Sequence, residues 1–261
     1  MKSIGIIPAR YASTRFPGKP LVEVGGKMMI QRVYEQVSKL LDHVYVATDD
    51  DRIAKAVCSY GGKVIMTSPN HQSGTDRIAE AVETIAQTGK IFDIVINIQG
   101  DEPFINPTQI QLLMDCFNDP STDIATLVKV IDNEETLFNP NSPKVLINPR
   151  NEAQYFSRAG IPYMRGREAK DWLSHHTFYK HIGIYAFKTN VLRAVTRLPQ
   201  SSWELAESLE QLRWLENGYK IKVAVTEDEG IAIDTPADLD KANEWFLKTI
   251  KNETCINYRR Q

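Results

Sequence analysis

Short apolar runs alternate along the chain with longer stretches in which apolar residues recur every three or four positions. The short runs predict buried strands, at residues 4–7, 44–47, 63–66 and 93–98. The longer stretches predict amphipathic helices, at residues 28–41, 52–60, 75–88 and 107–117. Because strands and helices of these lengths follow one another, we predict βαβ units around a largely parallel sheet. Ligands are expected near the carboxyl ends of its strands.

The pattern becomes mixed in the second half of the chain. Residues 123–188 combine strand and loop character. A helix over residues 203–217 is predicted from a single apolar stripe formed by Leu205, Leu209, Leu212 and Leu215. No repeat, low-complexity segment or linker interrupts the chain. We therefore expect one domain, residues 1–261, with an elaborated region at about residues 123–217.

The last part of the chain returns to strand followed by helix. Strands are predicted at residues 220–226 and 231–233, and a helix is predicted to begin at Pro236. Thr235 suits the N-cap of this helix, Pro236 its first position and Asp238 its third.

Charge and cysteine usage narrow the class of protein. The formal net charge of −2 argues against bulk binding to nucleic acid, which needs a dense excess of Lys and Arg. Three cysteines far apart in the sequence favour a reducing cytosol over a disulfide framework. No apolar stretch approaches the roughly 20 residues of a membrane span, and the first apolar run is too short for a signal peptide. We expect a soluble, cytoplasmic protein without membrane insertion.

The segment after the first predicted strand, residues 8–21, concentrates positive charge. It carries Arg10, Arg15 and Lys19, and no acidic residue precedes Glu23. Its prolines prevent a continuous helix, and its small residues let backbone amides approach an anion. A triphosphate needs this combination of guanidinium groups, an ammonium group and open N–H groups. The alternative is a solvated basic loop, and the phosphate-loop and dinucleotide-binding motifs are both absent.

Two aspartates follow predicted strands far apart in the sequence. Asp101 comes after residues 93–98, and Asp234 comes after residues 231–233. Mg²⁺ is typically held by one or two carboxylates together with phosphate oxygens and water, so this pair predicts a magnesium site. The alternatives are a turn for Asp101 and helix capping for Asp234.

The acidic triplet at residues 49–51 is a competing metal site. An aspartate pair spaced by one residue after a strand is typical of metal-dependent glycosyltransferases. The triplet also directly precedes a predicted helix, so capping and the helix dipole explain it about as well. It ranks below Asp101 and Asp234.

The segment PARYASTRFPGKPL, residues 8–21, resembles the N-terminal signature of the 3-deoxy-manno-octulosonate (Kdo) cytidylyltransferases. Further blocks that resemble this family spread over nearly the whole chain: SGTDR at 73–77, NIQGDEP at 97–103, YFSRAGIPY at 155–163, KHIGIYAF at 180–187, LEQLRWL at 209–215 and IDTPADL at 233–239. The resemblance implies an α/β fold of the nucleotide-diphospho-sugar transferase type, a three-layer α/β/α sandwich with a mostly parallel, mixed sheet.

The resemblance also implies roles for individual residues on the nucleotide side. Asp101 and Asp234 are expected to bind Mg²⁺, and Asp101 is expected to act in catalysis with Arg10, Arg15 and Lys19. The expected nucleotide-binding residues are Ala9, Arg10, Lys19, Thr75, Arg77 and Gln99. By its sequence alone, the block around Thr75 and Arg77 equally suits the start of a helix.

The acceptor side is predicted from the second half of the chain. Strand alternation places Tyr179, His181, Gly183 and Tyr185 on one face, with a gap at Gly183. From the pattern alone, a strand with one solvent-facing side is the ordinary interpretation. Glu210 and Trp214 are placed opposite the leucine stripe of helix 203–217, where a solvated polar face is the ordinary interpretation. The resemblance implies that the sugar acid is bound by five residues: Arg158, His181, Tyr185, Glu210 and Gln211.

Together these observations favour a magnesium-dependent transfer of CMP from CTP to Kdo with release of pyrophosphate. The alternatives are a nucleotidyltransferase for another sugar, such as an amino analogue of Kdo, a glycosyltransferase using residues 49–51, and a nucleotide-sensing regulator. The resemblance further implies a cytoplasmic homodimer that supplies lipopolysaccharide synthesis.

Overall fold

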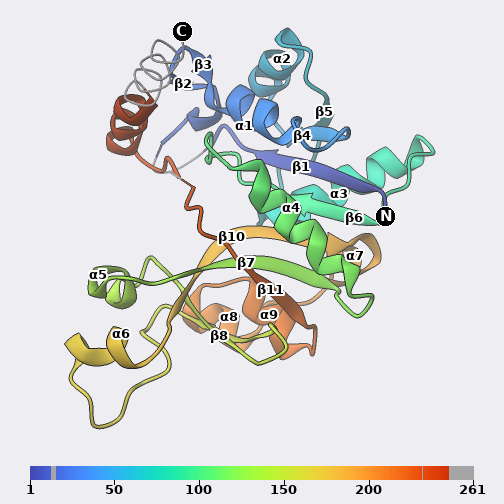
Figure 1. Cartoon of the computed structure of the whole chain (residues 1–261). Coiled ribbons are helices and arrows are strands. Elements are labelled where there is room, and N and C mark those ends of the chain that lie inside the picture. The colour runs from blue at the N-terminus through green and yellow to red at the C-terminus, as the bar shows by residue number, and fades with distance from the viewer. Residues whose placement is uncertain (13–15, 231, 247–261) are drawn as a thin grey trace, which may run out of the picture. The chain divides into compact units, whose positions relative to one another are not determined.

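The computed structural model describes residues 1–12, 16–230 and 232–246. The chain forms two compact units that interleave along the sequence, and Figure 1 labels their elements. The N-terminal unit comprises Ile4–Lys90, Ile98–Pro107 and the segment from Gly230 onward. The central unit comprises Met1–Ser3, Ile91–Asn97 and Thr108–Glu229.

The N-terminal unit is built on three parallel strands. They are β1 (Ser3–Ala9), β4 (Val44–Thr48) and β5 (Val64–Met66), paired in that order. All five residues of β4 are buried, as expected for an apolar strand covered on both faces. Helix α1 (Met29–Val37) lies between β1 and β4, α2 (Asp51–Ser59) lies between β4 and β5, and α3 (Gly74–Gln87) follows β5. The predicted βαβ pattern is confirmed for this unit.

Polar side chains define where two of these helices begin. The Asp50 carboxylate accepts a hydrogen bond from the backbone N–H of Arg52 at the start of α2. Ser73 and Asp76 form a reciprocal capping box at the start of α3. These contacts satisfy N–H groups that have no partner within the helix.

The segment from Gly230 onward packs on the beginning of the chain. Ile233 and Ala242 are fully buried in a cluster with Val24 and Met29. Val24 belongs to a small hairpin of β2 (Glu23–Val24) and β3 (Lys27–Met28), which follows the 3-10 helix η1 (Lys19–Leu21).

The predicted strand at residues 231–233 is wrong where the structure tests it. Ile231 lies outside the described residues, and Ala232 and Ile233 are not in a strand. Ile233 is buried by side-chain packing and not by pairing in a sheet. The helix predicted from Pro236 is confirmed over residues 236–246, and the Asp238 carboxylate accepts hydrogen bonds from the N–H and hydroxyl of Thr235.

The central unit contains a mixed sheet. Strand β10 (Tyr179–Lys188) runs antiparallel to β6 (Ile94–Asn97) on one side and to β7 (Ile124–Val130) on the other. Strand β11 (Ile221–Val225) pairs with β7 in parallel, and β8 (Lys144–Ile147) pairs with β10 and with β9 (Ala153–Ser157). The α/β class with a mixed sheet is confirmed.

Short helices connect the strands of this unit. They are α4 (Pro107–Asp115), η2 (Cys116–Asn118), α5 (Glu134–Phe138), η3 (Ala169–Asp171), α6 (Trp172–His175), α7 (Thr189–Val195), α8 (Ser202–Glu207) and α9 (Gln211–Glu216). Around α5 and α6, Trp172 and Phe178 stack with ring centroids 5.9 Å apart and share a separate apolar cluster with Ile131 and Leu137. This cluster gives residues 164–177 a core of their own.

The predicted continuous helix over residues 203–217 is wrong. It divides into α8 and α9 at Ser208, which adopts a left-handed conformation with φ 51°. The break leaves Leu205 62% exposed and turns Trp214, which the pattern placed opposite the leucines, into the core at 1% exposure. Ser208 ends α8 within the predicted stripe, and apolar periodicity gives no signal of a left-handed residue.

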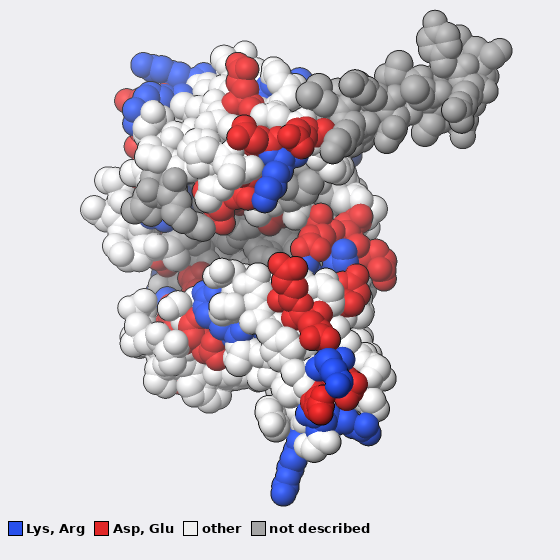
Figure 2. All heavy atoms as spheres, turned by 90° about the vertical axis from the view of Figure 1, so that its left-hand side faces the viewer, with Lys and Arg blue, Asp and Glu red and all other residues white. Residues whose placement is uncertain are grey.

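The surface agrees with the small net charge. On the face drawn in Figure 2, acidic and basic side chains are intermixed, and Lys and Arg form no continuous expanse among the coloured residues. Among residues 1–12, 16–230 and 232–246, no helix is both long enough and apolar enough to cross a bilayer.

Candidate active site

The loop after β1 is closed on itself before Lys19. The N–H of Gly18 donates to the carbonyl of Tyr11 at 2.9 Å, and Gly18 has φ 72°. A Cβ on Gly18 would lie 3.2 Å from the Tyr11 ring. The guanidinium carbon of Arg52 lies 3.2 Å from the centroid of the same ring. Position 18 favours glycine because its φ is positive and because a Cβ there would crowd the Tyr11 ring. The hydrogen bond from Gly18 to Tyr11 fixes the point at which η1 begins, at Lys19.

A close backbone approach places Asp101 beside this loop. The N–H of Ile98 donates to the carbonyl of Ile6 in β1 at 3.0 Å. Two residues later, a Cβ on Gly100 would stand 3.0 Å from the carbonyl oxygen of Pro8. Only a glycine lets the two backbones come this close without a shift, so Gly100 determines how near Asp101 lies to the basic loop.

Asp234 reaches the same place from the other end of the sequence. The N–H of Ile233 donates to the carbonyl of Asp101 at 3.0 Å, which joins the two segments directly. The buried Ile233 side chain and the cap of helix 236–246 hold the backbone on either side of Asp234.

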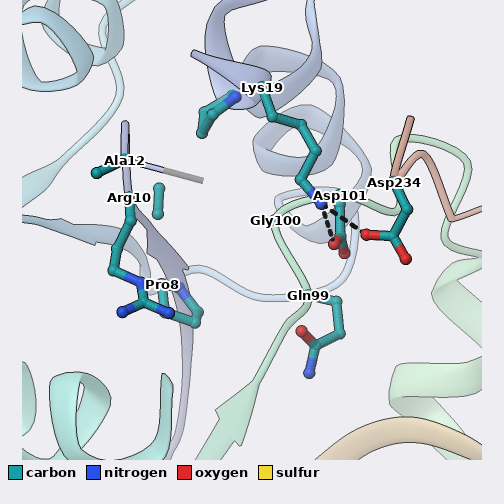
Figure 3. Close-up of a pocket in the computed structure, with 10 residues that line it drawn as sticks. Pro8, Arg10, Ala12, Lys19, Gln99, Gly100, Asp101 and Asp234 are labelled. Carbon is teal, nitrogen blue, oxygen red and sulfur yellow. Dashed lines mark hydrogen bonds and ion pairs between the residues drawn. The ribbon is translucent and has the colours of Figure 1, made fainter. Parts of the chain in front are cut away.

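The ammonium group of Lys19 lies between the two carboxylates. Its Nζ is 2.7 Å from Oδ2 of Asp101 and 3.1 Å from Oδ1 of Asp234, as Figure 3 shows. Burial by itself lowers the pKa of Lys19, but attraction to Asp101 and hydrogen bonds to both aspartates outweigh burial and raise it above the ordinary value. The ammonium therefore stays charged at neutral pH, and both carboxylates share one cation.

These side chains line a cavity of about 430 Å³ in the N-terminal unit. Its lining contains six of the residues predicted from the sequence: Ala9, Arg10, Lys19, Gln99, Asp101 and Asp234. In Figure 3 the Arg10 side chain extends away from the two aspartates, from the segment that follows Pro8. Arg15, the remaining cation predicted in the loop, lies outside the described residues. The cavity therefore has cationic groups, carboxylates and an amide around a space of ligand size.

Glu102, which the sequence interpretation did not single out, directly follows Asp101 but does not belong to the lining of the cavity. Burial, with a contribution from the charge of Asp101, raises the pKa of Glu102 to about 7. A Cβ on Gly230 would lie 2.7 Å from Oε2 of Glu102, so this glycine also permits close packing. The signal in the sequence was the pair of adjacent acidic residues after a buried strand.

Thr75 and Arg77 lie in α3 and do not belong to the lining of this cavity. Arg77 is 1% exposed; its guanidinium donates to the hydroxyl of Thr67 at 2.6 Å and pairs with Asp49 at 3.3 Å. Asp49 thus balances a buried charge, and Asp50 caps α2. The predicted capping is confirmed for Asp50, and the ion pair of Asp49 with Arg77 is a finding of the structure. Within the described parts of the chain, no group of three or more His, Cys, Asp or Glu side chains is arranged to hold a metal ion.

Two of the acceptor candidates meet in β10 of the central unit. The rings of His181 and Tyr185 have centroids 5.2 Å apart, and a Cβ on Gly183 would meet nothing within 4 Å. The space at Gly183 is therefore open, but the two rings contact each other and leave no gap between them. The prediction of one solvent-facing side is wrong for residues 184–187, which are all buried because β10 is flanked by β6 and β7 and packed against α9.

Burial fixes the protonation of these two groups. Burial lowers the pKa of His181 to about 3, so its ring is neutral at pH 7. The Thr126 hydroxyl is 2.8 Å from the carbonyl of Ile184, to which it donates, and 3.0 Å from Nε2 of His181. Because that hydroxyl has one proton, it accepts from His181, which places the ring proton on Nε2. Burial, and then the charge of Glu210, raises the pKa of Tyr185 well above its ordinary value, so the phenol keeps its proton.

Helix α9 carries buried polar atoms next to these rings. Trp214 contacts Tyr185 edge to face, with centroids 5.0 Å apart. The Nε2 atom of Gln211 and the Nε1 atom of Trp214 are buried and have no hydrogen-bond partner among the described protein atoms. Such atoms are costly unless a ligand or water satisfies them. Glu210 lies at the N-terminus of α9.

Arg158 is engaged with the backbone of the α8–α9 connection. Its side chain donates to the carbonyls of Glu207, Pro140 and Ser208, at 2.7, 2.9 and 3.2 Å. The Glu207 carboxylate in turn accepts from the hydroxyl of Ser157 and the N–H of Arg158. Arg158 therefore holds the left-handed Ser208 in place, and two of its five N–H groups remain for a carboxylate.

Comparison with known proteins gives a consistent result. The family model for cytidylyltransferases matches residues 4–221. The 3-deoxy-manno-octulosonate cytidylyltransferase of Parabacteroides distasonis is 64% identical over 93% of this chain and 97% of that protein. The one of Bacteroides thetaiotaomicron is 61% identical over 95% of this chain and 99% of that protein. The solved structure of CMP:2-keto-3-deoxy-manno-octonic acid synthetase complexed with CTP matches with a TM-score of 0.88 and 41% identity, over 95% of this chain and 100% of that one.

The close approach at Gly100 gives a test of the cavity. Gly100→Ala places a methyl group 3.0 Å from the Pro8 carbonyl, which forces the two backbones apart by a few tenths of an ångström. We expect CTP to bind about tenfold more weakly, since small displacements at a binding site are costly, while the thermal unfolding temperature falls only modestly.

Gly74→Ala is the matched control. Its Cβ would also face Pro8, but at an ordinary contact distance of 3.4 Å from Cγ, so CTP binding measured by calorimetry should be close to that of the wild type. Equal CTP affinities for Gly100→Ala and Gly74→Ala would contradict the role given to Gly100.

Proposed function

This chain belongs to the 3-deoxy-manno-octulosonate cytidylyltransferase family, and we propose that it transfers CMP from CTP to the 2-hydroxyl of Kdo. The hydroxyl oxygen attacks the α-phosphorus, the bond from that phosphorus to the bridging oxygen breaks, and pyrophosphate leaves with the bond electrons. The proton of the hydroxyl is lost. The product is CMP-Kdo, an activated sugar.

The observation that carries this proposal is the convergence of Asp101, Asp234 and Lys19 in one cavity at the end of β1. Two carboxylates come together there on a single cation, at 2.7 and 3.1 Å. Arg10 and the small residue Ala12 line the same cavity. A triphosphate carries dense negative charge and travels with a divalent cation, so it needs basic groups and carboxylates side by side.

The two aspartates fit Mg²⁺, which we propose as the cofactor. Both are carboxylates, the oxygen ligands that Mg²⁺ prefers, and the ammonium of Lys19 stands where a cation is favoured by both. When bound, Mg²⁺ supplies charge neutralisation at phosphate oxygens and orients the triphosphate. Asp101 and Asp234 would hold it.

The chain's own residues bind and orient the nucleotide. Arg10 and Lys19 are placed to neutralise phosphate oxygens, and the lining position of Gln99 suits contact with the nucleoside. We propose Arg15 as a third phosphate ligand on the basis of its place in the loop motif. Catalysis then rests on positioning and electrostatic stabilisation, without a covalent intermediate on the enzyme.

We propose that the acceptor is bound in the central unit by His181, Tyr185, Glu210 and Gln211, with the free N–H groups of Arg158 available to the sugar carboxylate. Kdo offers several hydroxyl groups and one carboxylate. A neutral imidazole, a protonated phenol and a buried amide nitrogen with no partner among the described residues are groups that recognise hydroxyls by hydrogen bonds.

Two alternatives are less well supported. A glycosyltransferase using residues 49–51 is disfavoured because Asp49 pairs with Arg77 and Asp50 caps α2. A regulator that binds CTP without turnover does not require two carboxylates on one cation. Membership of the family also supports a cytoplasmic homodimer whose product supplies lipopolysaccharide synthesis, and we include these points in the proposal.

Pyrophosphate release tests the proposed reaction directly. CTP, UTP, ATP and GTP are each offered with Kdo and Mg²⁺, and CTP is then offered with the 8-amino analogue of Kdo. We expect release with CTP and Kdo at a rate at least about 100-fold above the other nucleotides, and CMP-Kdo by mass spectrometry. Binding of CTP without pyrophosphate release would instead support the regulator.

The same assay includes two matched variants. Asp101→Asn removes a charge at the proposed metal site and should lower the rate at least about 100-fold with an unchanged circular dichroism spectrum. Asp51→Asn, at an exposed position in the first turn of α2, should retain the rate. Loss of activity in Asp51→Asn alone would favour the glycosyltransferase site.

The unpartnered amide of Gln211 gives a separate test of the acceptor side. Gln211→Leu should raise KM for Kdo about tenfold with little change in kcat or in CTP affinity, because the lost hydrogen bond serves ground state and transition state alike. Gln154→Leu, at an exposed position of β9, is the control.

A structural role for Gln211 predicts a different result. Replacing a buried amide that lacks a partner by an apolar group of similar size would then raise the unfolding temperature. An unchanged KM for Kdo together with that rise would remove Gln211 from the acceptor site.

A further inference from the structure

Lys19 occupies the position between the two carboxylates that the proposed function gives to a divalent cation. Its ammonium is hydrogen-bonded to both Asp101 and Asp234, and its side chain is 15% exposed. The aspartate side chains are 27% and 38% exposed. The ion pairs of Lys19 with the two aspartates are therefore partly buried, and opposite charges attract more strongly there than at a fully exposed surface.

The backbone of Lys19 is held by its neighbours, whereas its side chain is a long stem with several rotatable bonds. Gly18 closes the preceding loop on Tyr11, and Pro20, which follows, is buried. The four-carbon stem of a lysine can swing its ammonium through several ångströms while the backbone stays still. Lys19 shares the cavity with Arg10, so an ammonium released from the aspartates remains in the space where a polyphosphate would bind.

The ammonium and Mg²⁺ cannot both occupy this position. Mg²⁺ needs its oxygen ligands at about 2.0–2.1 Å, whereas Nζ already lies 2.7 Å and 3.1 Å from the nearest oxygens of the two aspartates. Two cations held by the same oxygens would be only a few ångströms apart and would repel each other strongly.

We propose that Lys19 is an internal counter-ion that competes with the divalent metal for Asp101 and Asp234 and is exchanged for it when the polyphosphate binds. The ammonium then moves to phosphate oxygens, and the carboxylates take the metal. The metal and the triphosphate therefore bind cooperatively. The triphosphate draws the Lys19 ammonium away from the aspartates, and the metal then takes the place of the ammonium. This inference rests on the proposed function, and it adds that the metal binds poorly to the protein without nucleotide.

Binding of Mn²⁺ to the nucleotide-free protein tests the competition. Mn²⁺ replaces Mg²⁺ as a probe because its free form is detected by electron paramagnetic resonance. Lys19→Met keeps the apolar stem and removes the ammonium, so we expect it to bind Mn²⁺ at least about tenfold more tightly than the wild type. Mn²⁺ should also raise its thermal unfolding temperature more than that of the wild type. Lys19→Gln provides a second variant if the first fails to fold.

Two controls separate direct competition from a general change of charge. Arg10→Met removes one positive charge from the same cavity, but Figure 3 shows Arg10 directed away from the aspartates, so it should change Mn²⁺ affinity much less. Lys27→Met removes a lysine that is bonded to Glu35 at the surface, and it should leave Mn²⁺ affinity unchanged. Equal or weaker Mn²⁺ binding by both Lys19 variants would overturn the proposal.

The outcome is independent of turnover. If the Lys19 variants bind Mn²⁺ no more tightly while the wild type still releases pyrophosphate from CTP and Kdo, this inference fails and the proposed function stands. If the wild type releases no pyrophosphate, the proposed function fails, whatever the metal affinities are.

Discussion

The site depends on the attraction of two carboxylates, from distant parts of the sequence, to one positive charge. Asp101 and Asp234 lie 82 and 215 residues from Lys19, yet both bond its ammonium. Two carboxylates this close would repel each other without a cation between them. The N-terminal unit therefore has a built-in preference for positive charge at this point. Nucleotide chemistry requires such a preference, since a triphosphate reacts only when its own charge is balanced.

The parts of this site that depend on local sequence could be predicted. A buried strand followed by glycine and aspartate placed Asp101 at the edge of a sheet, and the basic loop at residues 8–21 predicted a phosphate site. The strand before Asp101 is confirmed, because strand ends depend on neighbouring residues, whereas the phosphate site stays a prediction. A Cβ on Gly100 would lie 3.0 Å from the carbonyl oxygen of Pro8. This close approach joins two segments that are distant in sequence, and only the structure reveals it.

Other features had no local signal. A leucine stripe predicted one helix over residues 203–217, but Ser208 at φ 51° divides it and directs Trp214 into the core. The hydrogen bonds of Arg158 to the carbonyls of Glu207 and Ser208 stabilise that division, and Arg158 directly follows β9, about 50 residues earlier in the chain. Likewise, no local pattern indicates that Arg77 is buried and pairs with Asp49 and Thr67. Each of these features depends on a partner elsewhere in the sequence.

In the proposed function, Asp101 and Asp234 together hold the divalent cation that accompanies the nucleotide. Crystals grown with CTP and Mn²⁺, measured at a wavelength where manganese scatters anomalously, locate that ion without assumptions about the reaction. We expect an anomalous peak within coordination distance of one carboxylate oxygen from each aspartate and of a phosphate oxygen, with the Lys19 ammonium moved onto the phosphates. A manganese ion held by phosphate oxygens and water alone, with Lys19 still between the two aspartates, would contradict this expectation.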